Sequence, residues 1–289
     1  MEMPQAEFDA VDYFVHERGR APAPPPQLAL YLDYGHAGLA EVFPQLLDDL
    51  AATAPGVRPV AAGWALSREP STGTDTWTSD TLDRVMAALR TGRVEMLQIS
   101  FADAEDRRLS LALDAVPSDP SAGQGVSASS AQLWTPSTAE SLLDLIGRQR
   151  GLRTAAVTWD RTGLHSSAWE LWYDVLPHEM VRHTRDHVRG YYWATLLTAG
   201  HLARLPDLRQ RAEAADFVVV PLGDGLLVRD PAPITDFDDT RLAAAKQLYR
   251  PVLLDRQYIC YQGYPLRIIR DPGTAFRRVP PGSPFPQLT

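Results

Sequence analysis

Residues 28–34 read LALYLDY, an almost unbroken apolar run that ends at the turn residue Gly35. A short run rich in Leu and Tyr before a glycine is typical of a buried β-strand. Apolar residues then recur at helical spacing, at Leu39, Val42, Phe43, Leu46, Leu47 and Leu50. Pro55-Gly56 ends this helix. A buried strand followed directly by an amphipathic helix predicts a domain built from both kinds of element.

The same alternation continues as far as residue 116. A helix capped by Thr78, Ser79 or Asp80 is closed by Gly92, and a charged turn at 103–108 joins the last two strands. The predicted strands are 28–34, 60–66, 94–101 and 109–116, the helices are about 39–53 and 80–90, and 67–76 is a loop. The order is therefore β-α-β-α-β-β.

A Ser-, Pro- and Gly-rich stretch at 117–125 is the best candidate for an internal boundary, and a partly similar order follows it. Ser137 or Thr138 caps a helix there, with Glu140 completing a capping box. Gly223-Asp224-Gly225 is a strong hairpin signal. The predicted strands are 126–134, 154–159, 190–197, 217–221, 226–229 and 255–270, with helices near 138–148 and 198–205 and a last helix capped by Asp238 or Asp239.

These elements predict an α+β fold of two packed α/β layers with mixed or antiparallel sheets. The recurring order indicates a pseudo-duplicated architecture, although the repeat is one of pattern and not of residues. The expected divisions are an N-terminal segment with a Pro-rich spacer (1–27), a first half (28–116), a second half (126–278) and a loosely ordered tail (279–289). We expect the halves to form one compact unit.

The composition is that of a globular protein, with 45% hydrophobic and 22% charged residues in a chain of 289. No apolar run approaches the roughly 20 residues that span a bilayer, and the acidic N-terminus does not resemble a signal peptide. We therefore expect a cytoplasmic protein without a membrane partner. Cys260 is the only cysteine, which excludes an intramolecular disulfide and a metal site built from cysteines.

Charge is spread unevenly along the chain. Residues 1–150 hold 21 acidic and 11 basic residues, a net of −10, and residues 151–289 hold 15 acidic and 17 basic residues, a net of +2. An acidic half repels nucleic acid and can steer a basic protein partner into contact. Simple solubility is the alternative explanation. Since 27 of the 28 basic residues are arginine, their number is better explained by a GC-rich genome than by nucleic-acid binding.

The densest group of metal-type ligands is PHEMVRHTRDH, residues 177–187. A zinc-protease helix needs histidines at i and i+4, but His178 and His183 are five residues apart, and only His183 and His187 share a helix face. A solvated, charge-rich segment is the favoured interpretation, and a metal-dependent enzyme using the His178–His187 cluster is the alternative. The aspartates at 236, 238 and 239 are better explained by helix capping than by metal binding.

No phosphate-binding loop or nucleophile elbow is present, so we predict no catalytic residue, cofactor or metal site. Protein partners are the better expectation. Of seven tryptophans, those at 64, 134, 159 and 193 fall in predicted strands and are expected in the core. The remaining aromatic candidates and the acidic turn are the predicted partner-binding residues: Trp77, Trp169, Trp172, Asp103, Glu105 and Asp106.

Residues 189–205, RGYYWATLLTAGHLARL, resemble a segment of the immunity proteins of bacterial polymorphic toxin systems, in particular the family called type VI immunity. The similarity continues through the strand-turn-strand at 217–229 and the aspartate-capped helix at 236–249, and residues 28–50 fit the first element of that family.

The resemblance implies a cytoplasmic antidote that binds a cognate protein toxin and blocks it by contact, without catalysis. An acidic half would suit a basic toxin such as a nuclease. Two other classes stay open, an enzyme acting through the His178–His187 cluster and a structural or regulatory module.

Overall fold

The structure is a computed structural model that describes residues 27–35, 38–66, 74–115, 123–160 and 180–253. Its strands are β1 (Gln27–Tyr34), β2 (Arg58–Leu66), β3 (Thr74–Thr76), β4 (Val94–Ala102), β5 (Arg108–Ala115), β6 (Gln124–Ser130), β7 (Leu152–Asp160), β8 (Ala194–Leu197), β9 (Val218–Leu222) and β10 (Gly225–Arg229). Its α-helices are α2 (Gly38–Ala52), α3 (Ser79–Arg90), α4 (Thr138–Arg148), α7 (Ala199–Leu202), α8 (Leu208–Ala214) and α9 (Asp239–Tyr249).

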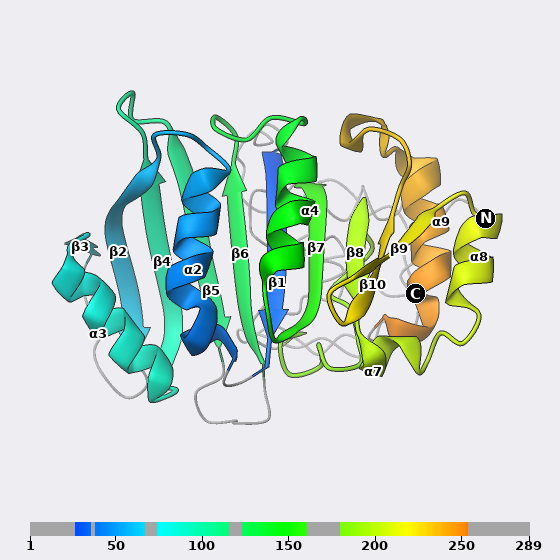
Figure 1. Ribbon diagram of the computed structural model, residues 1–289, viewed down its shortest axis with the longest axis horizontal. Coiled ribbons are helices and arrows are strands. Elements are labelled where there is room, and N and C mark those ends of the chain that lie inside the picture. Colours follow the sequence, from blue (N-terminus) through cyan, green and yellow to red (C-terminus); the bar gives the residue numbers. More distant parts are fainter. Residues whose placement is uncertain (1–26, 36–37, 67–73, 116–122, 161–179, 254–289) are drawn as a thin grey trace, which may run out of the picture.

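The strands form one sheet in the order β3-β2-β4-β5-β6-β1-β7-β8-β10-β9, and every neighbouring pair is antiparallel. The predicted α+β class with an antiparallel sheet is confirmed. In Figure 1, α2 and α4 lie across one face of the sheet, while α8 and α9 stand beyond the β9 end. Strand β1 lies between β6 and β7, so the two halves of the chain share one sheet and lie side by side.

Both faces of β1 are buried, as is typical of a strand in the middle of a sheet. Leu28, Leu30 and Leu32 alternate towards the main core, and Tyr31 belongs to a second cluster on the opposite face. A strand covered on both sides needs a continuous apolar run, which LALYLDY supplies. Full burial of each leucine contributes about 2 kcal/mol of hydrophobic free energy, so the strand anchors the core.

Helix α4 connects two strands that flank β1. Strands β6 and β7 both run antiparallel to β1, so they are parallel to each other and need a return connection across the sheet. The buried side of α4 packs into the main core through Ala139, Leu142, Leu143, Leu145 and Ile146. This crossover leaves the last turn of α4 beside β8 and the β9–β10 hairpin, where the candidate site lies (Figure 1).

Most predicted helix ends are confirmed, and one is wrong. Thr78 caps α3 with its side chain, and Asp238 accepts from the backbone N–H of Arg241 at the start of α9. Ser137 makes no capping hydrogen bond to α4, so the predicted capping box with Glu140 does not form. The Ser137 hydroxyl instead lies 2.7 Å from the hydroxyl of Thr135 and hydrogen-bonds with it.

Several predicted boundaries differ from those of the structure. The strand expected at 126–134 ends at Ser130, whose hydroxyl accepts from the N–H groups of Gln132 and Leu133 and so turns the chain. The strand expected at 190–197 forms only over β8. Strand β3 lies in the predicted loop, and α8 was not predicted. The Pro-rich spacer, the strand expected at 255–270 and the tail lie outside the described residues.

The β9 edge of the sheet has few free backbone groups with which a further strand could pair. The two-residue turn closes with Leu222 opposite Gly225, so Val219 and Pro221 direct their backbone groups outward. Pro221 has no N–H to donate, and Arg209 of α8 donates to the Val219 carbonyl at 3.4 Å. The edge is therefore protected against pairing with another chain. None of the helices within the described ranges is long and apolar enough to cross a membrane.

Candidate functional site

A groove of about 510 Å³ opens between the last turn of α4 and the β9–β10 turn. This volume lies in the range of about 300–1,000 Å³ that is usual for ligand sites. The lining residues come from four places in the sequence: Ile146–Leu152 at the end of α4, Leu196 in β8, Thr198 before α7, and Leu222–Gly225 at the hairpin turn.

The α4 wall of the groove is held in place by a buried carboxylate. Asp49 of α2 is 6% exposed and accepts from Arg148 Nε at 3.1 Å and from Gln149 Nε2 at 2.7 Å. The hydroxyl of Tyr34 donates to Gln149 Oε1 at 3.1 Å. Burial, reinforced by the charges of Asp49 and Asp33, raises the pKa of Tyr34, so the phenol stays protonated as a donor.

The floor and the opposite wall are fixed by close packing. A Cβ on Gly147 would lie 2.9 Å from Leu222 Cδ1, so the end of α4 packs closely against the Leu222 side chain of β9. Beneath the groove, the hydroxyl of Thr198 donates to the Arg153 carbonyl at 2.6 Å, and that of Thr154 donates to the Leu196 carbonyl at 2.7 Å. The groove is therefore formed in advance of any ligand.

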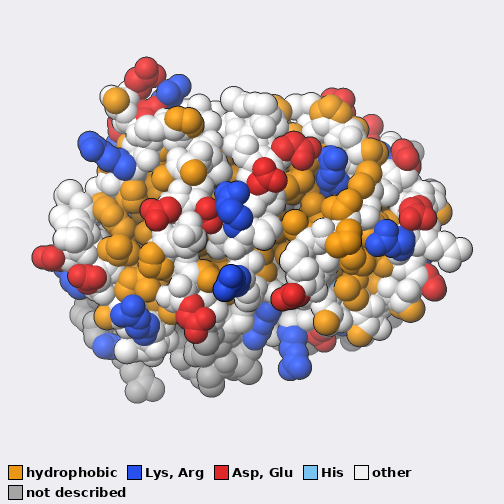
Figure 2. Space-filling view, viewed as in Figure 1, with side chains coloured by type: hydrophobic (Ala, Val, Ile, Leu, Met, Phe, Trp, Pro, Cys, Tyr) orange, Lys and Arg blue, Asp and Glu red, His pale blue; other side chains and the backbone are white. Residues whose placement is uncertain are grey.

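The rim of the groove carries charges of both signs. Arg150 and Asp224 are exposed, and neither forms an ion pair in the described part of the chain. Arg148 is held by Asp49, but its side chain stays 51% exposed. Figure 2 shows basic groups near the lower end of α4 and hydrophobic groups over the neighbouring β9–β10 region. The groove therefore has a floor of leucine side chains, a wall that carries two arginines, and Asp224 on the opposite rim.

On the opposite face of the sheet lies a cluster of buried polar residues. Asp33 and Arg189, each 1% exposed in the side chain, have their charged atoms 3.9 Å apart. The Arg189 guanidinium lies 4.8 Å from the Tyr31 ring centroid, and Tyr31 stacks on Tyr192 at 5.5 Å. The cavity among these side chains measures about 10 Å³, the space of about one water molecule.

This cluster joins the segment before β8 to the sheet. A Cβ on Gly125 would lie 2.7 Å from Val181 Cγ1 and 3.0 Å from Asp33 Oδ1, so the segment lies directly on β6. Burial and the neighbouring Arg185 lower the pKa of Arg153, while Asp33 acts to raise it. The cluster is too small for an organic ligand, and its geometry suits a structural role.

The fold is similar to that of the Pseudomonas aeruginosa T6SS protein PA0821. The two structures superpose with a TM-score of 0.52 at 12% sequence identity, over 86% of this chain and 81% of that chain. At this level of identity the similarity concerns the fold alone. No protein-family model matches the sequence. No curated protein matches it either.

In the described part of the histidine segment, Met180 is helical and residues 181–186 form turns. The His183 and His187 rings are 6.2 Å apart and nearly perpendicular. Arg204 Nη1 donates to His187 Nε2 at 2.8 Å, so the imidazole proton lies on Nδ1, 3.0 Å from Asp186 Oδ1. Both nitrogens of His187 therefore have partners.

The charges around His187 also affect Asp186. Burial acts to raise its pKa, but the hydrogen bond from the His187 Nδ1–H and the nearby Arg204 cation outweigh burial and lower it. Within the described residues no group of three or more His, Cys, Asp or Glu side chains could hold a metal ion. His178 and Glu179 lie outside the described residues.

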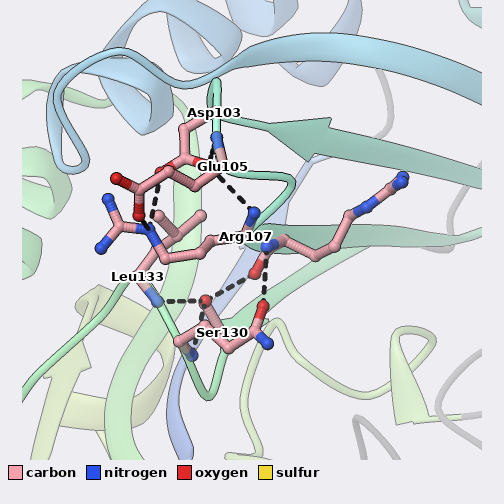
Figure 3. Close-up of polar contacts among 7 residues, drawn as sticks. Asp103, Glu105, Arg107, Ser130 and Leu133 are labelled. Atoms are coloured by element: carbon pink, nitrogen blue, oxygen red, sulfur yellow. Dashed lines mark hydrogen bonds and ion pairs between the residues drawn. The ribbon is translucent and has the colours of Figure 1, made fainter.

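The predicted acidic turn between β4 and β5 is largely neutralised by its own arginines (Figure 3). Asp103 Oδ1 accepts from the N–H groups of Glu105 and Arg107, each at 2.9 Å, and Oδ2 accepts from Arg107 Nε at 2.7 Å. Arg107 Nε also lies 3.4 Å from Glu105, and Arg108 lies 2.5 Å from Asp106. Three acids and two arginines leave one net negative charge.

The tryptophans expected in the core are mostly there. Trp64, Trp134 and Trp193 are buried, and Trp159 is half-buried against the core. Trp77, predicted as a partner-binding residue, is also half-buried against the core, with its backbone N–H donating to the Val60 carbonyl. Trp169 and Trp172 lie outside the described residues.

The groove was not found by sequence reasoning. Its residues come from four separate segments, and only the glycine-rich turn at 223–225 was singled out, as a hairpin. Gly147, inside an otherwise good helix, was the available signal, because an interior glycine often marks close packing against another element.

Proposed function

We propose that this protein is an immunity protein of a type VI secretion-like toxin system, which binds a cognate toxin by direct contact and blocks it. The observation that carries the proposal is the similarity of fold to a T6SS protein over most of both chains. The resemblance of residues 28–50 and 189–250 to type VI immunity proteins supports the same function. The proposed place of action is the cytoplasm.

Neutralisation by contact makes a specific physical demand. The surface must be rigid before the partner arrives, because ordering side chains at an interface costs about 0.5–1.5 kcal/mol for each flexible one. The groove meets this demand, since hydrogen bonds from Tyr34, Arg148 and Gln149 and the close contact of Gly147 with Leu222 fix its walls. No catalytic group is required for this function.

The proposal is tested by co-expressing the tagged full chain with the product of the gene directly upstream. We expect a stable one-to-one complex and rescue of cells from that product. An unrelated toxin serves as control and should neither co-purify nor be neutralised. Absence of both binding and rescue would overturn the proposal, and stoichiometric zinc in the purified protein would favour the enzymatic alternative at His178–His187.

A further inference from the structure

We propose that the groove between α4 and the β9–β10 turn is a peptide-binding site. Its ligand is an extended segment of a partner protein that carries an acidic side chain next to an apolar one. The inference rests on the proposed function in so far as the partner is the cognate toxin, but the peptide chemistry follows from the groove itself.

The requirement for apolar side chains comes from the floor. Leu152, Leu196 and Leu222 line the groove from three different elements. Leu152 and Leu222 are only half-buried, so a ligand can remove more of their apolar surface from water. Burial of that surface favours binding roughly in proportion to the area covered.

The requirement for an acidic side chain comes from the α4 wall. Arg150 projects from this wall without an ion-pair partner among the described residues, and Arg148 is held by Asp49 with half of its side chain still exposed. Two guanidinium groups beside an apolar floor favour a carboxylate, which an arginine can bind through two parallel hydrogen bonds. On the other rim, Asp224 favours a basic residue further along the same segment.

An extended segment is favoured over an added β-strand. Strand β9 cannot accept a new strand easily, because Pro221 lacks an N–H and Arg209 occupies the Val219 carbonyl. The groove also lies at the ends of β7, β8 and β9, where side chains and turns, and not an open backbone edge, form the walls. Recognition therefore depends on side chains.

The first test needs no knowledge of the partner. The immobilised full chain is used to select from a phage-displayed library of random heptapeptides, and the selected peptides are then titrated in solution. We expect selected peptides to pair Asp or Glu with Leu, Ile or Phe. Replacing Arg150 by Glu should weaken their binding about three- to tenfold, since the exposed ion pair is lost and the reversed charge repels the peptide carboxylate.

Two controls give this test its specificity. Arg90, in the last turn of α3, is an exposed arginine at a similar place on another helix, and Arg90→Glu should leave peptide affinity unchanged. Exchanging the peptide acid for lysine should restore binding to the Arg150→Glu variant. Selection of peptides without acidic residues, or equal affinity in the Arg150→Glu and Arg90→Glu variants, would overturn the peptide site.

The second test uses the upstream-gene product with the same variants. Loss of co-purification in Arg150→Glu but not in Arg90→Glu supports the groove as the toxin contact. If the toxin binds all variants equally and the selected peptides ignore Arg150, the groove proposal fails while the immunity proposal stands. If acidic peptides bind through Arg150 but no toxin binds the wild type, the immunity proposal fails and the peptide site stands.

Discussion

Replacing Arg241 by Met should strongly destabilise the second half of the fold. The side chain of Arg241 donates through Nε to the Asp230 carboxylate, through Nη1 to the Ala215 carbonyl at 3.0 Å and through Nη2 to the Asp216 carbonyl at 2.9 Å. Its guanidinium also lies 4.4 Å from the Phe217 ring centroid. One side chain thus joins the start of α9 to the end of β10 and to the turn before β9.

The magnitude follows from burial. Asp230 is 1% exposed in its side chain and Arg241 is 22% exposed, so removing the cation leaves a carboxylate out of contact with most solvent. Breaking a buried pair by removing one partner costs about 3–5 kcal/mol, and the partial exposure of Arg241 favours the lower end, about 3 kcal/mol. For a chain of this size the melting temperature should fall by roughly 6–12 °C.

The assay is urea-induced unfolding followed by circular dichroism, with the slope of unfolding free energy against urea compared between variants. Arg241→Lys should lose about half as much stability, because one ammonium cannot replace three diverging N–H donors. Arg90→Met, the same exchange at an exposed site, serves as the control and should change little. A loss below about 1 kcal/mol in Arg241→Met would show that the Arg241–Asp230 pair does not hold α9 to the sheet.

Three further predictions concern His201, Gly200 and His183. Burial lowers the pKa of His201 in the folded protein. In the unfolded chain this histidine has its ordinary pKa of about 6.5, so the unfolded state binds the proton first as the pH falls. The free energy of unfolding should therefore decrease as the pH falls through about 6.5. His201→Gln, which keeps a side chain able to cap at Thr198, should flatten this dependence in unfolding experiments near about pH 5.5 and about pH 7.5; an unchanged slope would contradict it. Gly200→Ala places a Cβ 2.1 Å from the Arg185 carbonyl oxygen and should cost about 1–3 kcal/mol in urea unfolding, and a neutral result would show that α7 can move away. His183→Ala should leave rescue from the toxin unchanged, whereas loss of rescue with an intact fold would favour the enzymatic alternative.

The sequence predicted most of the helices and strands because their signals are local. The run at 28–34, the spacing of leucines in α2 and α4, and the Gly223-Asp224-Gly225 turn each depend on neighbours within a few residues. The order of strands could not be predicted in the same way. That β1 inserts between β6 and β7 depends on pairings about 100 residues apart, for which the sequence carries no local signal.

The candidate site was harder to predict from the sequence than the strand order. Asp49 lies in α2 and looks like an ordinary surface residue in the helical pattern, yet it is buried and holds Arg148 and Gln149 across about 100 residues. The acidic turn shows the opposite case, since its residues were correctly placed in a turn but their charge is offset by Arg107 and Arg108. Charge counted along a sequence does not show which charges are already paired.

The most direct test of the immunity proposal is co-purification of the tagged full chain with the product of the gene directly upstream, combined with a survival assay. We expect a one-to-one complex in which the upstream product no longer kills the cell. No complex and no rescue, with the protein folded and both chains expressed, would contradict it.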